Sequence, residues 1–120
     1  MNTLIWILQI ILALLFLYSG AMKSTQDREK LMSLNQTGVA NLSYASIRFI
    51  GITEILGAFG IILPLYLRVI PVLTPIAAVC FALIMVFAIR IHYKRGEFKQ
   101  VAFNIIIFLI ATWIALYRFI

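Results

Sequence analysis

Glu54 is the side chain in this sequence with the clearest capacity for chemistry. It is the only charged residue between Phe49 and Leu63, a stretch that is apolar apart from Thr53 and long enough to lie within a bilayer. A carboxyl group in lipid costs free energy unless it is paired or protonated, so an intramembrane acid marks a functional site by default. Two interpretations stay open: a ligand site in a cavity, or a structural ion pair with Lys23 or Arg48 that holds two helices in register.

The partners available to Glu54 follow from depth in the membrane. If four helices alternate in direction, the end of the first, the start of the second, the end of the third and the start of the fourth meet on one side. Glu54 lies about 10 Å beyond Ile47 at the helical rise per residue. The polar residues expected near it are Lys23, Arg48, Arg90, His92 and Asn104. Of these, Lys23, Arg48, His92 and Asn104 join Glu54 as candidate ligand-binding residues.

His92 is the only histidine and Cys80 the only cysteine. A metal or haem site within one chain needs further ligands, so we expect no metal and a solvated His92 at the membrane interface, with ligand binding as the alternative. A single cysteine also excludes an internal disulfide or a redox pair. The basic run from Arg90 to Lys99 is typical of an anchor for lipid headgroups.

The elements that position these residues are four apolar segments. The chain of 120 residues is 64% hydrophobic and has a mean hydropathy of +1.08, which excludes an ordinary soluble domain. The predicted spans are 4–22, 47–66, 72–91 and 101–117, each long enough to cross a bilayer as a helix. We therefore predict an all-α, polytopic membrane protein, a single up-and-down bundle of four transmembrane helices over residues 1–120.

The first segment also has to be weighed as a signal peptide. Its start carries no basic residue and its apolar stretch is longer than usual, so we expect a retained helix. Between the first two spans, the segment from Asp27 to Leu34 predicts a short interfacial helix, which residues 35–38 would end.

Basic residues set the predicted orientation. Eight of the ten flank the first and third connections, and only Arg68 and Arg118 lie on the opposite side. Positive charge favours the cytoplasm, so both termini are predicted outside it. The net charge of +6 is not arranged as on a nucleic-acid-binding surface, and we expect no nucleic acid partner. The lipid bilayer is the expected surroundings.

Small residues close to Glu54 predict tight helix contacts. In lipid, such residues let neighbouring backbones approach closely. Gly51, Glu54 and Ala58 share one helical face, so the acid is expected to point into the bundle. The candidate packing residues are Gly20, Gly51, Gly57, Ala58 and Gly60.

Three segments carry a family resemblance. Phe16–Lys23 reads Phe-Leu-Tyr-Ser-Gly-Ala-Met-Lys, residues 51–58 read Gly-Ile-Thr-Glu-Ile-Leu-Gly-Ala, and Met85, Ala88 and His92 follow. Together they resemble the DoxX-like family of small four-helix membrane proteins. The resemblance implies a bacterial inner-membrane protein with Lys23 and Glu54 at family-pattern positions. It also implies a link to quinone-dependent redox systems, redox-stress complexes or membrane-protein assembly.

Two functions compete. The first is a non-catalytic module, without a cofactor of its own, that binds a quinone-like or lipid-like amphiphile at Glu54 and Lys23 in support of a redox partner. The second is a structural or assembly protein that docks other membrane proteins, or copies of itself, through small-residue helix faces. A proton or ion pore is a weaker third candidate, because polar groups are almost absent from the opposite half of the bundle.

Overall fold

The computed structural model describes residues 2–34 and 36–120. Its long helices are α1 (Asn2–Thr25), α3 (Tyr44–Gly60), α5 (Leu73–Lys94) and α6 (Phe98–Phe119), joined by the short helices α2 (Arg28–Ser33) and α4 (Leu63–Leu67) and the 3₁₀ turn η1 (Thr37–Val39). The described residues contain helices and no strand, and four helical segments are long and apolar enough to cross a membrane. The predicted all-α class with four spans is therefore confirmed.

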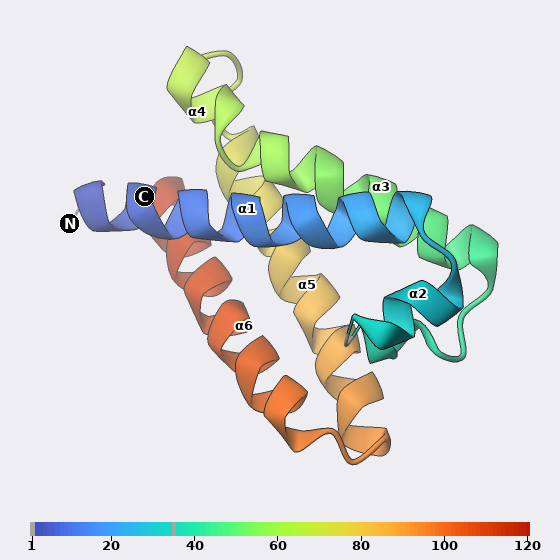
Figure 1. The fold of residues 1–120 in the computed structure, drawn as a ribbon. Coiled ribbons are helices and arrows are strands. Elements are labelled where there is room, and N and C mark those ends of the chain that lie inside the picture. The colour runs from blue at the N-terminus through green and yellow to red at the C-terminus, as the bar shows by residue number, and fades with distance from the viewer. Residues whose placement is uncertain (1, 35) are drawn as a thin grey trace.

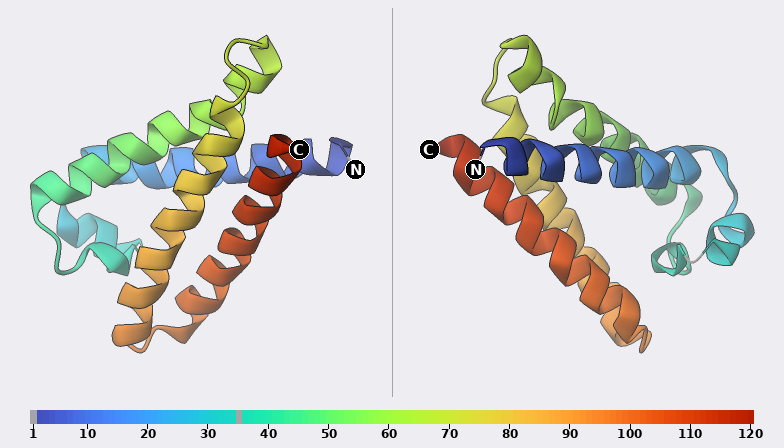
Figure 2. Two further views of the ribbon diagram at one scale, coloured as in Figure 1. Left: turned by 180° about the vertical axis from the view of Figure 1, so that it is seen from behind. Right: turned by 60° about the vertical axis from the view of Figure 1, so that its left-hand side comes forward.

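The four long helices pack as two antiparallel hairpins. Most helix contacts fall within the α1–α3 pair and the α5–α6 pair, and fewer join one pair to the other. Figure 1 and Figure 2 show the hairpins crossing near the end where both termini lie and diverging toward the other end. The helices alternate in direction, as predicted, but they do not form an evenly spaced bundle. We call these two regions the terminal end and the diverging end.

The core of the protein fills the crossing between the hairpins. Phe16 of α1 stacks on Phe81 of α5 with ring centroids 3.9 Å apart, inside a cluster that includes Leu12, Ala78 and Ile114. Each hairpin alone would leave these apolar side chains uncovered, and the stacked rings cover each other where the two hairpins meet. A smaller cluster lies away from the crossing and holds the connection between α1 and α3.

That connection, residues 26–43 without Asn35, folds against the long helices, and we call it loop one. Asp27 accepts a hydrogen bond from the Lys30 amide at 2.8 Å and begins α2, as capping acids do. Leu31 is fully buried with Val39 and Ile47. The predicted short helix is present. Of the segment expected to end it, Asn35 lies outside the described residues.

The second predicted span, 47–66, differs from the structure because its helix breaks. α3 ends at Gly60 and α4 restarts at Leu63. Pro64 has no N–H to donate to the Gly60 carbonyl, and within lipid that oxygen needs another donor. The Thr74 hydroxyl donates to it at 3.3 Å, while the buried Gln9 amide donates to the Ile61 carbonyl at 2.7 Å. Side chains of α1 and α5 thus supply hydrogen bonds to the two carbonyls at the break in the helix.

Candidate functional site

A cavity of about 500 Å³ lies between the two hairpins at the diverging end. Its walls come from the second half of α1, the first half of α3, the second half of α5, the first half of α6 and loop one. Apolar side chains such as Phe16, Ile84, Met85 and Ile107 form much of the lining. The polar lining residues are Tyr18, Ser19, Lys23, Gln36, Thr53, Glu54, His92, Gln100 and Asn104. The space exists because the hairpins diverge there.

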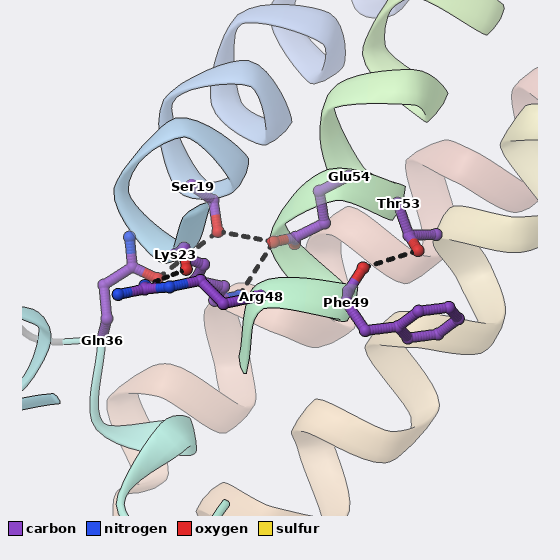
Figure 3. A network of polar contacts seen from close by, with 7 residues as sticks. All are labelled: Ser19, Lys23, Gln36, Arg48, Phe49, Thr53 and Glu54. Carbon is purple, nitrogen blue, oxygen red and sulfur yellow. Dashed lines mark hydrogen bonds and ion pairs between the residues drawn. The ribbon is translucent and has the colours of Figure 1, made fainter. Parts of the chain in front are cut away.

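Glu54 lies on this cavity and is 1% exposed. Lys23 Nζ is 3.0 Å from Glu54 Oε1, and the Ser19 hydroxyl donates to the same oxygen at 3.1 Å. Figure 3 shows both donors reaching from α1 toward the acid on α3. Among the described residues, no hydrogen bond is recorded to Oε2. The ion pair and the cavity therefore occur together, and the acid keeps one carboxylate oxygen for another partner.

The pair forms because α1 and α3 approach closely at two glycines. A Cβ on Gly20 would lie 2.6 Å from the Gly51 carbonyl oxygen, and one on Gly51 would lie 2.7 Å from the Ser24 hydroxyl. Gly20 lies between Ser19 and Lys23, so both side chains start from the point of closest contact. Glu54 follows Gly51 by one helical turn. The glycines thus set the register of the ion pair.

The other candidate packing residues face the second hairpin or the core. A Cβ on Gly57 would lie 2.6 Å from the Phe81 ring, and one on Gly60 would lie 3.4 Å from the Ala77 Cβ. Ala58 is buried in the core at the crossing. All five small residues therefore pack within the chain.

Arg48 lies apart from the cavity lining. Its Nη1 donates to the carbonyls of Lys23 and Gln26, each at 2.6 Å. A cation that binds the last carbonyls of a helix satisfies groups that have no partner within the helix and interacts favourably with its dipole. Arg48 thus caps the end of α1 and holds the backbone of Lys23, while the side chain of Lys23 reaches Glu54.

His92 is buried, so the expectation that this histidine is solvated was wrong. Its Nδ1 is 2.9 Å from Glu97 Oε1, and its ring faces Gly38 of loop one. Loop one covers this end of α5, which hydropathy alone did not indicate. The nearby hydroxyl of Thr37, the ring of His92 and the guanidinium of Arg95 hold the pKa of Glu97 below its usual range. His92 lines the cavity from beneath loop one.

Asn104 is 8% exposed and faces the cavity from α6. Its side chain makes no recorded hydrogen bond to any described residue. Its amide nitrogen and oxygen are not among the fully buried side-chain atoms without a partner, so they are free to bind water or a ligand in the cavity. Gln100, one turn earlier on α6, also lines the cavity. The structure thus gathers Lys23, Glu54, His92 and Asn104 around one space and leaves Arg48 outside it.

Comparison with known proteins identifies the family. A family model described as the DoxX-like family matches residues 7–114, most of the chain. The chain belongs to the DoxX-like family. Neither the curated proteins nor the solved structures contain a match. The predicted resemblance is confirmed, and with four spans this DoxX-like protein is a multi-pass membrane protein.

Sequence reasoning missed a second polar cluster in this DoxX-like protein, which surrounds a buried glutamine at the terminal end. Gln9 is fully buried, and its Oε1 accepts a hydrogen bond from Arg118 Nε at 2.7 Å. Arg118 also donates to Asn2 at 2.8 Å and lies over the rings of Trp6 and Tyr117. A lone glutamine within an apolar span was the available signal. We call Asn2, Gln9 and Arg118 the terminal cluster.

Ser19 and Gln36 were also not predicted as site residues. Ser19 is four residues before Lys23, so both lie on one face of α1, and that spacing was a readable signal. Gln36 reaches the cavity because loop one folds back over it, and its Oε1 lies 3.4 Å from the Ser19 hydroxyl, whose one proton is donated to the closer Glu54 Oε1. Among the residues described, no three His, Cys, Asp or Glu side chains are placed to hold a metal ion. The cavity cluster, as used below, is Ser19, Lys23, Glu54 and Asn104.

Proposed function

We propose that this DoxX-like protein is a non-catalytic membrane module that binds a quinone-like or lipid-like amphiphile in the cavity, in support of a redox partner. Glu54 and Lys23 lie at the polar end, and aliphatic and aromatic side chains hold the tail. The observation that carries the proposal is the cavity itself, which joins buried polar groups to apolar walls. Its volume, about 500 Å³, is within the range of small-molecule sites, roughly 300 to 1,000 Å³.

Exposed aromatic residues on both sides of the cavity support an amphiphile over a wholly polar ligand. Phe49 on α3 and Phe87 on α5 line the cavity and are 72% and 67% exposed. Phe103 on α6 lines it from the α1–α6 side and is also exposed. These side chains belong to segments at membrane depth, so an apolar tail that leaves the cavity there meets lipid.

The proposed location is the bacterial inner membrane, with both termini outside the cytoplasm. Basic residues gather at the diverging end, in loop one and around the turn between α5 and α6, and these positions favour the cytoplasmic side. The cavity then opens toward the cytoplasmic leaflet. Labelling a cysteine introduced at Lys99, with Cys80 replaced by Ala, from each side of sealed membranes tests this orientation.

The experiment for binding fills the cavity without touching its polar groups. Ala88 lines the cavity on α5, so Ala88→Phe should displace the ligand. Ala102 is exposed on α6 and does not line the cavity, so Ala102→Phe is the matched control. We expect mass spectrometry of gently extracted protein to find an amphiphile in the wild type and in Ala102→Phe, and to lose it in Ala88→Phe. Equal retention by all three proteins would contradict the proposal.

The competing assembly function has less support from the geometry. Gly20 and Gly51 contact each other's helices, and Gly57 and Gly60 face α5. A docking surface made of these residues would have to open the hairpins first. Replacing Gly57 by Leu and measuring complex size therefore reports on folding of the chain as well as on docking.

A further inference from the structure

We infer that the cavity selects an uncharged headgroup that carries a hydroxyl donor beside an oxygen acceptor, and that it discriminates against anionic phosphate headgroups. This inference rests on the proposed function and concerns the chemistry of the ligand at the same site. It comes from three features: the charge balance of the lining, the free oxygen of Glu54 and the unpartnered amide of Asn104.

The charge balance disfavours an anion. Among the described lining residues, Lys23 and Glu54 lie 3.0 Å apart and balance each other, and His92, the other lining side chain that can carry positive charge, is 2.9 Å from Glu97 Oε1. Arg48 does not line the cavity and is bound to carbonyls at the end of α1. A phosphate placed beside Glu54 would add negative charge in a site of low polarity without a further counterion, which is unfavourable. A cationic amine beside Lys23 would be unfavourable for the same reason, because it would add positive charge without a further counterion.

The hydrogen-bonding groups specify the headgroup further. Both recorded contacts of the Glu54 carboxylate are to Oε1, and a carboxylate can only accept, so a ligand group at Oε2 must donate. Asn104, nine-tenths buried and facing the cavity from the other hairpin, offers both a donor and an acceptor. A neutral hydroxyl next to a second oxygen satisfies both residues. Monoacylglycerols and prenylated hydroquinones share this chemistry.

The test is a competition among four probes added together to the purified full chain in mild detergent, read by native mass spectrometry. Monooleoylglycerol and a prenylated hydroquinone carry the proposed headgroup. Methyl oleate is neutral without a donor, and oleoyl lysophosphatidylglycerol has hydroxyls and an anionic phosphate. We expect at least one of the first two to be retained about tenfold over the last two, since one hydrogen bond to a charged group supplies that much discrimination. The better retained of the first two identifies the source.

Two outcomes separate this inference from the proposed function. If methyl oleate or the lysophosphatidylglycerol is retained as well as the best neutral donor, and Ala88→Phe loses all of them, the headgroup rule is overturned and the amphiphile site stands. If the wild type retains no probe more than Ala88→Phe does, the proposed function fails together with the inference.

Two variants test whether the Asn104 amide is responsible for the selection of the headgroup. Asn104→Leu should lower retention of the neutral donor about tenfold and leave methyl oleate unchanged, because only the amide contact is lost. Thr53→Val is the control, since the Thr53 hydroxyl lines the cavity but already donates to the Phe49 carbonyl at 2.8 Å. Should Asn104→Leu fail to fold by circular dichroism, the wild-type competition still decides. Equal losses in Asn104→Leu and Thr53→Val would contradict the assignment.

Discussion

The terminal cluster and the cavity cluster both place polar side chains within membrane helices, yet they differ in how those side chains are satisfied. At the terminal end, the Gln9 amide donates to the Ile61 carbonyl and accepts from Arg118, so its oxygen and nitrogen both have partners. At the diverging end, Glu54 has partners on one oxygen and Asn104 has none recorded among the described residues. The Gln9 amide at the helix crossing is satisfied by protein, although Arg118 Nη2 beside it is buried without a hydrogen-bond partner, whereas the free groups of Glu54 and Asn104 face the cavity.

Packing accounts for this difference. At the crossing, the stacked rings of Phe16 and Phe81 bring the hairpins together, and each polar group lies next to another helix. At the diverging end, the hairpins separate and only loop one enters the gap. Buried polar residues in a membrane protein are therefore not equally informative, and those beside a cavity are the better evidence for a ligand.

The largest effect expected is on the ion pair of the cavity cluster. Lys23→Met removes the partner of Glu54, which is 1% exposed, and breaking a buried pair costs about 3 to 5 kcal/mol. Glu54→Gln should cost less, because Lys23 is less buried than Glu54 and can extend toward water. Thermal unfolding in detergent measures both. Equal losses of stability in the two variants would show that Lys23 without its partner is as costly as Glu54 without its partner.

The next effect concerns the contact that positions this pair. Gly20→Ala places a Cβ 2.6 Å from the Gly51 carbonyl oxygen, a backbone atom that cannot move aside, so we expect a loss of about 1 to 3 kcal/mol from overpacking. Gly60→Ala, whose Cβ would be 3.4 Å from the Ala77 Cβ, is the matched control and should be near neutral. A Gly20→Ala protein as stable as Gly60→Ala would contradict the close approach of α1 and α3.

A smaller loss is expected at the terminal cluster. Gln9→Leu removes the donor to the Ile61 carbonyl and the acceptor of Arg118, which should lower stability by about 1 kcal/mol, as interhelical hydrogen bonds in membranes do. Ligand retention should not change, because Gln9 does not line the cavity. If Gln9→Leu lost the ligand but little stability, the terminal cluster would act in ligand binding, which contradicts the contrast drawn between the two clusters.

The smallest effect is a pH dependence of loop one. The pKa of Glu97 is lowered in the folded protein, so its contribution is present above the ordinary carboxyl pKa, about 4.3, and is lost as pH falls through the lowered value. The protection of the η1 amides, expressed relative to the intrinsic exchange rate at each pH, should therefore fall in acid, and Glu97→Gln should lower it at neutral pH. Glu29→Gln, on the exposed face of α2, is the control. Identical exchange in all three proteins would exclude an attachment of loop one through Glu97.

Much of the site could be read from residue type and position along the spans. Lys23, Glu54, His92 and Asn104 were expected on one side of the membrane, and alternating helices bring them to one cavity. Arg48 was expected there on the same argument, but its guanidinium binds the nearer carbonyls of α1. Depth along a helix is local information, whereas the choice between two partners of similar depth depends on side-chain geometry.

The amino-acid sequence by itself determined that this chain lies in a membrane, which four segments cross it, and that it belongs to the DoxX-like family, because hydropathy and motifs are properties of contiguous residues. The tertiary structure decided that the hairpins cross and diverge, that loop one buries His92, and that Gln9 meets Arg118 across 109 positions. Those features depend on which side chains of distant segments fit together. The cavity, and with it the proposed function, follows from that fit.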